Sequence, residues 1–318
     1  MPKTILVTAT NYSTLCLEAK ALLEGAGCRV IENEHGRPLT FEEIKPLAPE
    51  IDAVVAGVDT WNEAVFGIAP RLKAIARFGV GVDNIDVAAA NRHGITVTNC
   101  RNVNSNSVAE QTMALILSAV RRVPELQAST KLGKWERAIF TELRDMTLGL
   151  IGFGSIGASV AKKAKAFDMR VIAYDPFPNA ALAESLGVEL LPLEAVLSAS
   201  DVLSLHLPST AETRHFINAD SLARVKKGAY VVNTARGALI DETALLEALR
   251  SGHLAGAAVD VYESEPVDPK SPLFQESRFI GTPHVAAESY RVYSECGLMT
   301  ARAILDVFDG KTPVNKLG

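Results

Sequence analysis

The 318-residue sequence contains little cysteine, no excess of basic residues and no long hydrophobic run. Its four cysteines form no CxxC pair, which argues against a zinc ribbon or a disulfide scaffold and indicates a reducing compartment, the cytoplasm. The 32 basic and 37 acidic residues give a formal net charge of −5, whereas nucleic-acid-binding proteins usually carry a basic excess. We therefore expect no structural metal, no disulfide and no nucleic-acid partner.

No stretch approaches the roughly 18 to 20 uninterrupted apolar residues that a membrane span requires. The longest candidate, Met113 to Val120, is short and stops at Arg121 and Arg122. The β-branched run at Thr4–Thr8 is shorter than the apolar region of a secretory signal. At about 150 residues per domain, the length predicts two domains. The sequence thus predicts a cytoplasmic two-domain protein without a membrane anchor.

Short apolar segments alternate with longer segments of helical period, which indicates parallel sheets with helices on both faces. The expected strands are 5–7, 29–31, 53–56, 74–76 and 96–98 in a first series, and 147–151, 171–174, 202–205, 230–232 and 257–259 in a second, with a further short strand-like segment at 278–280 just before His284. The expected helices include 14–23, 41–47, 104–122, 158–167, 242–249 and 286–308. Ser105 or Ser107 is expected to cap the helix at 104–122, and Glu110 has the capping-box spacing from Ser107.

A glycine-rich motif opens the second series. Gly152, Gly154 and Gly157 form G-x-G-x-x-G between an apolar strand and an alanine-rich helix. In a dinucleotide site such glycines allow a tight turn, a close approach of backbone to pyrophosphate, and close helix–strand packing. The N–H groups of Ser155 and Ile156 are expected to face the anion at the start of the helix.

An acid follows the next strand, because Asp175 lies 18 residues after Gly157. A carboxylate at this place accepts hydrogen bonds from the ribose 2′-hydroxyl of NAD and repels the 2′-phosphate of NADP. Pro176 and Phe177 follow it, and no arginine does. The sequence therefore predicts an NAD site. The alternative is a doubly wound domain with a tight turn and an exposed aspartate.

A nicotinamide enzyme acting on a hydroxyl or oxo group also needs a general acid/base and a cation. Arg236 follows the strand at 230–232, at the carboxyl end where open α/β sheets bind ligands, and its guanidinium can hold a carboxylate. The alternative for Arg236 is a surface arginine in a turn. His284 precedes the last helix, and Asp260 and Glu265 follow the strand at 257–259. A carboxylate beside a histidine fixes its tautomer and raises its pKa, but spacing alone does not establish that pairing.

Together these segments resemble the D-isomer-specific 2-hydroxyacid dehydrogenases over nearly the whole chain, and within them most closely the D-3-phosphoglycerate dehydrogenases. The motifs that carry the resemblance are the glycine motif with Asp175, Asn233-x-Ala235-Arg236-Gly237, Asp260-Val261-x-x-x-Glu265-Pro266, Pro283-His284, and the segments 77–86 and 133–137. The resemblance implies two doubly wound parallel-sheet α/β domains. A flavodoxin-like substrate domain would comprise 1–100 and 287–318, and an inserted Rossmann NAD-binding domain 101–286.

The resemblance also implies residue roles. His284 would be the acid/base, Glu265 its partner and Arg236 the substrate clamp, while Asp260 would meet the nicotinamide carboxamide. The substrate-binding residues would be Arg77, Phe78, Gly79, Val80 and Arg236, with the loop offering N–H groups to the substrate carboxylate. Further cofactor contacts would come from Leu207, Pro208, Thr234, Ala235, Arg236, His284 and Ala286. The family is usually dimeric through the segment 126–144, which would let Arg137 reach a substrate phosphate across a homodimer interface.

The expected function is hydride transfer between NAD and C2 of a D-2-hydroxy acid, with 3-phosphoglycerate as the leading substrate. One alternative is a reductase of glyoxylate, hydroxypyruvate or a similar 2-oxo acid, and another is a non-catalytic NAD-sensing corepressor. Two features depart from the phosphoglycerate subgroup. Ala56-Gly57-Val58-Asp59 stands where many members carry an arginine, and the sequence ends at Gly318, so feedback by serine through a further domain is not expected.

Overall fold

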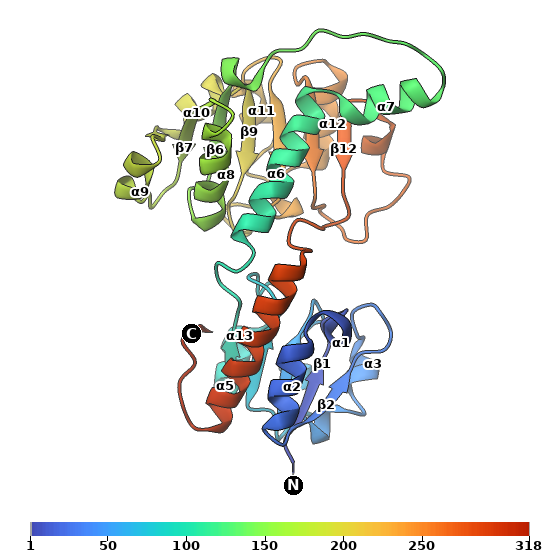
Figure 1. Cartoon of the computed structure of the whole chain (residues 1–318), viewed down its shortest axis with the longest axis vertical. Coiled ribbons are helices and arrows are strands. Elements are labelled where there is room, and N and C mark those ends of the chain that lie inside the picture. Colours follow the sequence, from blue (N-terminus) through green and yellow to red (C-terminus); the bar gives the residue numbers. More distant parts are fainter. Residues whose placement is uncertain (1, 318) are drawn as a thin grey trace. The chain divides into compact units, whose positions relative to one another are not determined.

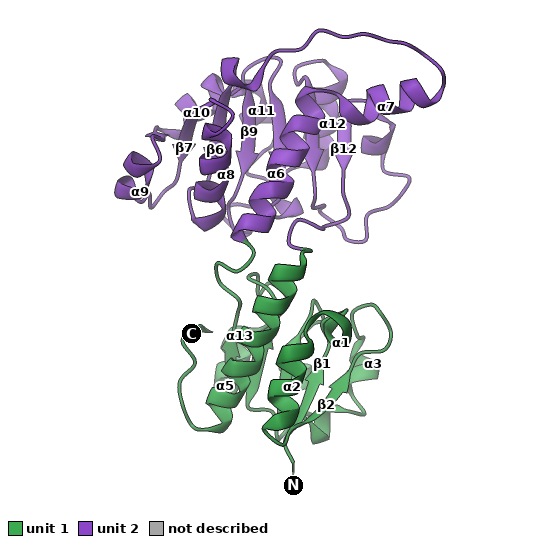
Figure 2. Ribbon diagram, in the orientation of Figure 1, with its two compact units in different colours: residues 1–104, 288–318 green, residues 105–287 purple. Residues whose placement is uncertain are grey.

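The computed structural model describes residues 2–317, and the chain divides into two compact units (Figure 2). The first unit holds the residues up to Asn104 and those from Glu288 onward, and the second is Ser105–Ala287. The second unit therefore interrupts the first in the sequence. Among the helices of residues 2–317, none has the length and apolar character that crossing a bilayer demands.

The first unit contains a six-stranded sheet with the order β13-β5-β4-β3-β1-β2. The first five strands are parallel in the order 2-1-3-4-5, which is flavodoxin-like, and β13 adds an antiparallel edge. The buried Ile, Val and Ala residues of β1 and β3 suit a sheet covered on both faces. The strands are β1 (Thr4–Val7), β2 (Arg29–Glu32), β3 (Ala53–Ala56), β4 (Ala74–Arg77), β5 (Thr96–Thr98) and β13 (Lys316–Leu317).

Helices cover both faces of this first sheet. Ile5 of β1 belongs to a core with Leu23 and Ile304, while Leu6 faces a second core on the other side. The expected helix at 14–23 is wrong in one respect, since Cys16 leaves helical geometry (φ −120°, ψ 38°) and divides it. The helices are α1 (Tyr12–Leu15), α2 (Leu17–Gly25), α3 (Phe41–Ile44), α4 (Glu63–Phe66), α5 (Val87–Arg92) and α13 (Tyr290–Phe308).

The second unit contains a seven-stranded sheet with the order β12-β11-β10-β9-β6-β7-β8, and all its strands are parallel. The first strand of this unit, β6, lies between β7 and β9, so the strand order reverses beside it. Such a reversal opens a crevice at the carboxyl ends of the strands, where dinucleotides bind. The strands are β6 (Thr147–Ile151), β7 (Arg170–Tyr174), β8 (Glu189–Leu190), β9 (Val202–Leu205), β10 (Tyr230–Asn233), β11 (Gly256–Val259) and β12 (Phe279–Gly281).

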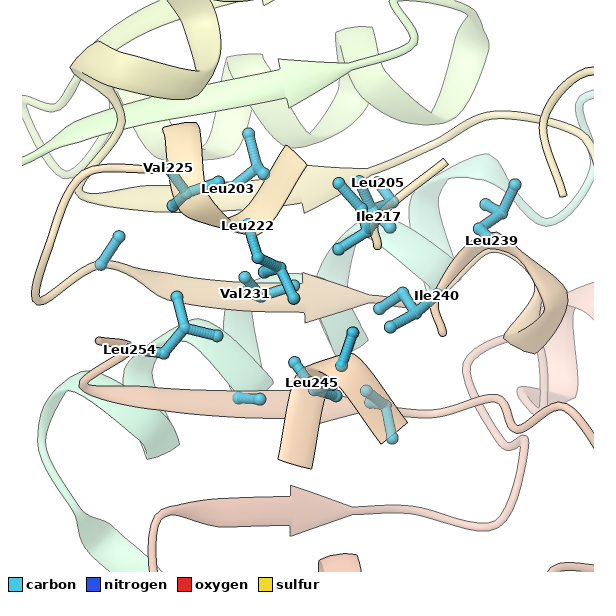
Figure 3. Close-up of a cluster of buried hydrophobic side chains, with 14 of the residues drawn as sticks. Leu203, Leu205, Ile217, Leu222, Val225, Val231, Leu239, Ile240, Leu245 and Leu254 are labelled. Atoms are coloured by element: carbon cyan, nitrogen blue, oxygen red, sulfur yellow. The ribbon is translucent and has the colours of Figure 1, made fainter. Parts of the chain in front are cut away.

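Helices cover both faces of the second sheet as well (Figure 1). Residues of α6, α8 and α9 form one core, and those of α10, α11 and α12 form a leucine-rich core against the other face (Figure 3). The helices are α6 (Ser105–Val120), α7 (Val123–Lys131), α8 (Ser155–Lys165), α9 (Ala180–Ser185), α10 (Leu193–Ala199), α11 (Ala219–Arg224) and α12 (Glu242–Arg250). The predicted fold class, two parallel-sheet α/β domains, is confirmed.

Three further helix predictions differ from the structure at the start of the helix, and one of them is α8, which begins at Ser155 rather than at 158. Because α6 begins at Ser105, Ser107 lies inside the helix, and its hydroxyl donates to the Ala286 carbonyl at 2.8 Å rather than completing a capping box. The final helix begins at Tyr290 rather than at 286, since Ser289 caps it by accepting a hydrogen bond from the Val292 N–H.

Candidate active site

The loop between β6 and α8 depends on its three glycines for different reasons. Gly152 has a left-handed backbone (φ +96°), and a Cβ there would lie 2.6 Å from the His206 carbonyl oxygen. A Cβ on Gly157 would lie 2.4 Å from the Gly152 carbonyl oxygen. Gly154 is different, because no atom other than those of Gly154 and its two chain neighbours lies within 4 Å of its Cβ position. An anion can therefore approach the backbone at Gly154, where the amino end of α8, beginning at Ser155 and Ile156, favours negative charge.

Asp175 ties this loop to the end of β7. One carboxylate oxygen accepts from the Phe153 N–H at 2.7 Å, and the other accepts from the Phe177 N–H at 2.8 Å. A carboxylate has about four acceptor positions, so it retains capacity for a ribose hydroxyl. The exposed space at Gly154 and the acceptor at Asp175 fit an NAD cofactor.

The loop after β9 packs directly against the glycine loop. His206 faces Gly152 with its backbone carbonyl, and its Nε2 lies 3.0 Å from the Ser204 hydroxyl. Burial lowers the pKa of His206 to about 4, so its imidazole is neutral near pH 7. Of the two following residues, Leu207 is buried and Pro208 is exposed.

Asn233 shapes the turn after β10. Its side chain accepts from the Ala235 N–H at 3.0 Å and donates to the Arg236 carbonyl at 2.8 Å. The buried Thr234 hydroxyl lies 2.8 Å from the hydroxyl of Thr112 on α6. These contacts fix the half-buried Arg236, whose Nη1 donates to the Ala235 carbonyl at 2.7 Å.

The predicted pairing of His284 with Glu265 is present in the geometry of the second unit. His284 Nδ1 lies 2.7 Å from Glu265 Oε2, and Glu265 Oε1 accepts from the Tyr262 N–H at 3.0 Å. The hydrogen bond to Glu265 raises the pKa of His284. Burial alone would raise the pKa of Glu265, but the hydrogen bonds from His284 and Tyr262 outweigh burial and lower it. Arg236 is close enough for its charge to act on both members of the pair.

Asp260 organises the loop that carries His284. Its fully buried carboxylate accepts from the Thr282 hydroxyl at 2.5 Å and from the N–H groups of Val285 and Ala286 at 3.0 and 2.8 Å. Its carbonyl accepts the His284 N–H at 2.8 Å. His284 has a positive φ of 53°, which is costly for a non-glycine residue unless its surroundings enforce it. Sequence reasoning missed this role, and the expected contact of Asp260 with a carboxamide stays a prediction.

In the first unit, the predicted substrate loop follows β4, and Arg77, Phe78, Gly79 and Val80 are all half-buried. The Phe78 N–H donates to the Ala56 carbonyl at 2.8 Å, and the Gly79 N–H donates to the Arg77 carbonyl at 2.9 Å. Two of the N–H groups expected to meet a substrate carboxylate are therefore already bonded within this unit. Their role toward substrate stays a prediction.

A buried acid lies near Arg77 in the same unit. Asp59 is 1% exposed, and its carboxylate accepts a hydrogen bond from the Leu39 N–H. Burial raises the pKa of Asp59, although hydrogen bonds and the charge of Arg77 oppose the change. Arg137, predicted to reach a substrate phosphate, is exposed on the segment after α7.

Within residues 2–317, no three histidine, cysteine or acidic side chains gather in a way that could hold a metal ion. The four cysteines are free and buried.

Comparisons with known proteins identify the family of the chain. Residues 113–286 match the family model for the NAD binding domain of D-isomer specific 2-hydroxyacid dehydrogenases. The chain is 42% identical over 283 residues to a D-3-phosphoglycerate dehydrogenase of Archaeoglobus fulgidus, covering 88% of this chain and 54% of that protein. It is 40% identical over 273 residues to a glyoxylate reductase of Korarchaeum cryptofilum, covering 84% and 82% respectively.

A crystal structure of a Thermus thermophilus protein superposes with a TM-score of 0.91 at 36% identity, covering 99% of this chain and all of that one. The chain spans about half the length of the phosphoglycerate dehydrogenases it matches, 54% in the Archaeoglobus protein. The chain belongs to the D-isomer specific 2-hydroxyacid dehydrogenase family, and its second unit carries the family's NAD-binding domain.

Proposed function

We propose that this protein is an NAD-dependent oxidoreductase that interconverts a D-2-hydroxy acid and its 2-oxo acid. The 2.7 Å contact between His284 and Glu265, in the same unit as the glycine loop, is the observation that carries the proposal. A histidine held by a carboxylate is a competent general acid/base near neutral pH. Arg236, whose charge acts on this pair, supplies the cation that a carboxylate substrate needs.

The residues divide the chemistry between them. The backbone at Gly154 and the carboxylate of Asp175 would hold NAD, which would supply hydride acceptance from C2 of the hydroxy acid and, in its reduced form, hydride donation to C2 of the oxo acid. His284, held through Nδ1, uses Nε2 to accept the hydroxyl proton in oxidation and to donate a proton to the ketone oxygen in reduction. Arg236 orients the substrate carboxylate with its planar guanidinium and stabilises charge that develops on the reacting oxygen.

Two candidate substrate classes, which differ in the side chain of the acid, fit this proposal. The phosphoglycerate dehydrogenase relatives favour 3-phosphoglycerate, with a phosphoryl group of charge about −2 at pH 7. The segment Ala56-Gly57-Val58-Asp59 favours the second candidate, a small unphosphorylated acid, because it lacks the arginine that would bind a phosphoryl group there. The glyoxylate reductase relative agrees with the second candidate.

We also propose a homodimer in the cytoplasm. Helix α7 buries none of its residues, and Trp135 and Ile139 on the following segment are 85% and 102% exposed. The same region borders an open groove of about 690 Å³ whose lining mixes apolar side chains, such as Ile139 and Phe140, with charged ones, such as Arg121 and Arg144. Apolar side chains exposed together favour a partner surface, here a second copy of this chain.

The proposed location in the cytoplasm rests on the cysteines. Four free, buried cysteines are typical of a reducing compartment.

A substrate panel tests the proposed function. We expect NADH oxidation with glyoxylate, hydroxypyruvate or 3-phosphohydroxypyruvate, and the ratio of their kcat/KM values identifies the substrate class. His284→Ala should lower kcat by roughly 10² to 10⁴, as for a lost general acid/base, while NAD still binds. NAD binding without turnover of any 2-oxo acid, or unchanged turnover in His284→Ala, would contradict the proposal. The first result would favour a non-catalytic NAD sensor.

A further inference from the structure

The loop that carries Glu265 contains a second carboxylate with a histidine partner. This loop, residues 260–266, follows β11. While Glu265 holds His284, Glu263 accepts a hydrogen bond from Nε2 of His215, and Arg214 lies 3.5 Å from the same Glu263 oxygen. Two acids of one loop therefore bind two histidines of different segments.

His215 is itself firmly placed. It lies on the segment after β9 with a positive φ of 49°, and its N–H donates to the Ala238 carbonyl at 2.8 Å. Two residues later, Ile217 pairs with the strand-like segment at Ile240, donating to the Leu239 carbonyl at 2.9 Å. His215 is thus attached to the chain that directly follows the turn at Arg236.

The loop lies directly against that same turn. A Cβ on Gly237 would be 1.9 Å from the carbonyl carbon of Tyr262 and 2.5 Å from the nitrogen of Glu263, so the 262–263 peptide rests on Gly237. The Glu263 N–H also donates to Glu242 Oε1 at 2.9 Å. Steric contact with Gly237 prevents the loop from moving inward, and the buried Tyr262 ring, packed against Phe274, together with polar contacts keeps it from moving outward. The Glu263 side chain supplies one of these outward restraints.

We infer that the Glu263–His215 pair is a latch that positions Glu265 against His284. It holds the loop 260–266 on the turn after β10, so that the Glu265 carboxylate stays within hydrogen-bond distance of His284 Nδ1. Glu263 and His215 are positioning residues, since they act through Glu265. The charged groups around Glu263 are His215, Arg214 and Glu242, and those around His284 are Glu265, Asp260 and Arg236. The expected effect on turnover rests on the proposed function, but the effect on His284 protonation does not.

The latch should have a modest effect, because both side chains are about one-third exposed, at 34% for His215 and 30% for Glu263. Exposed pairs of this kind are weak individually. We expect Glu263→Ala in the full chain to lower the pH at which His284 titrates by roughly 0.3 to 1 unit, in the direction of an unpaired histidine. The measurement is an NMR pH titration of the ring C–H signals of the histidines, with the His284 signal assigned from a His284→Gln variant.

Three further variants make the test specific. His215→Asn, which tolerates the left-handed backbone, should shift the His284 titration as Glu263→Ala does, and the double variant should shift it no further. Glu265→Gln should give a larger shift. Glu194→Ala is the control, because it breaks a more exposed pair with Arg224 in the same unit, and it should leave the titration unchanged.

The outcomes separate the latch from the proposed function. An unchanged His284 titration in both Glu263→Ala and His215→Asn, with melting temperatures near that of the parent, would overturn the latch. If Glu263→Ala fails to fold, His215→Asn decides alone. A shifted titration in a protein that turns over no 2-oxo acid would leave the latch standing and reject the proposed function. In an active enzyme, the latch also predicts a loss in kcat of about threefold to tenfold.

Discussion

Two histidines at the carboxyl edge of the second sheet have opposite electrostatic environments. His206 is desolvated, and its pKa falls to about 4. His284 gains a charged partner in Glu265, and its pKa rises. Near pH 7 only His284 of these two can exchange a proton readily, since a neutral imidazole with a pKa near 4 rarely binds one. At the residue scale, burial or a charged partner therefore decides whether each imidazole can exchange a proton near pH 7.

The raised pKa of His284 predicts a definite pH dependence for reduction of a 2-oxo acid. This direction requires protonated His284, so kcat/KM should fall as the pH rises through the folded-state pKa. Replacing Glu265 with Gln removes the cause of the increase, and the fall should move to lower pH with a lower maximal rate. Steady-state NADH oxidation across pH checks this expectation. Superimposable profiles of the parent and Glu265→Gln would contradict it.

A substitution at Arg236 can test whether the planar shape of the guanidinium matters as well as its charge. Arg236→Lys keeps the positive charge but loses the planar fork that matches a carboxylate. We expect kcat/KM to fall by about 10², comparable to the loss of one well-placed donor to a developing charge. The melting temperature should change little because Arg236 is only half-buried. Equal kcat/KM values for the two proteins would remove Arg236 from the proposed role.

At the element scale, different glycines of the loop between β6 and α8 serve folding and ligand binding. Gly152 and Gly157 meet backbone atoms at their Cβ positions, whereas Gly154 meets nothing. The fold therefore requires glycine at the first and third places of the motif. The second place remains open for a ligand.

A pair of alanine variants tests this division. Gly154→Ala should leave the melting temperature close to that of the parent and weaken NAD binding, because the added methyl occupies the open space. Gly152→Ala should destabilise the protein by about 1 kcal/mol or more, since its φ and its contact with His206 both oppose a side chain. Calorimetric NAD titration and thermal unfolding distinguish the two effects. Equal affinity for NAD in Gly154→Ala would contradict the assignment.

Much of the element pattern could be predicted, because buried parallel strands are short apolar runs that long helical segments separate. The strands missed were β8 and β13, which have two residues each and exist only through pairing with β7 and β5. The break at Cys16 was also missed, since it changes no hydrophobic period. For the site, residue types at strand ends predicted Arg236 and His284. The loop-holding bonds of Asp260 join residues more than 20 positions apart and leave no local signal.

At the scale of the whole molecule, the exposed apolar residues of the segment after α7 predict self-association. Trp135→Ser combined with Ile139→Ser should convert a dimer into a monomer, because both side chains would lose a buried environment in the partner surface. Light scattering coupled to size-exclusion chromatography measures the mass. Val314→Ser, at an equally exposed site in the first unit, should leave the mass unchanged. A parent protein that is monomeric at micromolar concentration would reject the proposed homodimer.

The interruption of the first unit by the second has a consequence for biosynthesis. Strands β1–β5 are synthesised before the second unit. The elements α13 and β13 complete the first unit, but they emerge from the ribosome only after all of Ser105–Ala287 has been made. Until then the core around Ile5 and Leu23 lacks Ile304, and apolar surface on the nascent sheet stays uncovered. The second unit has all its elements in one continuous segment. The unit that is started second can therefore be the first to finish folding.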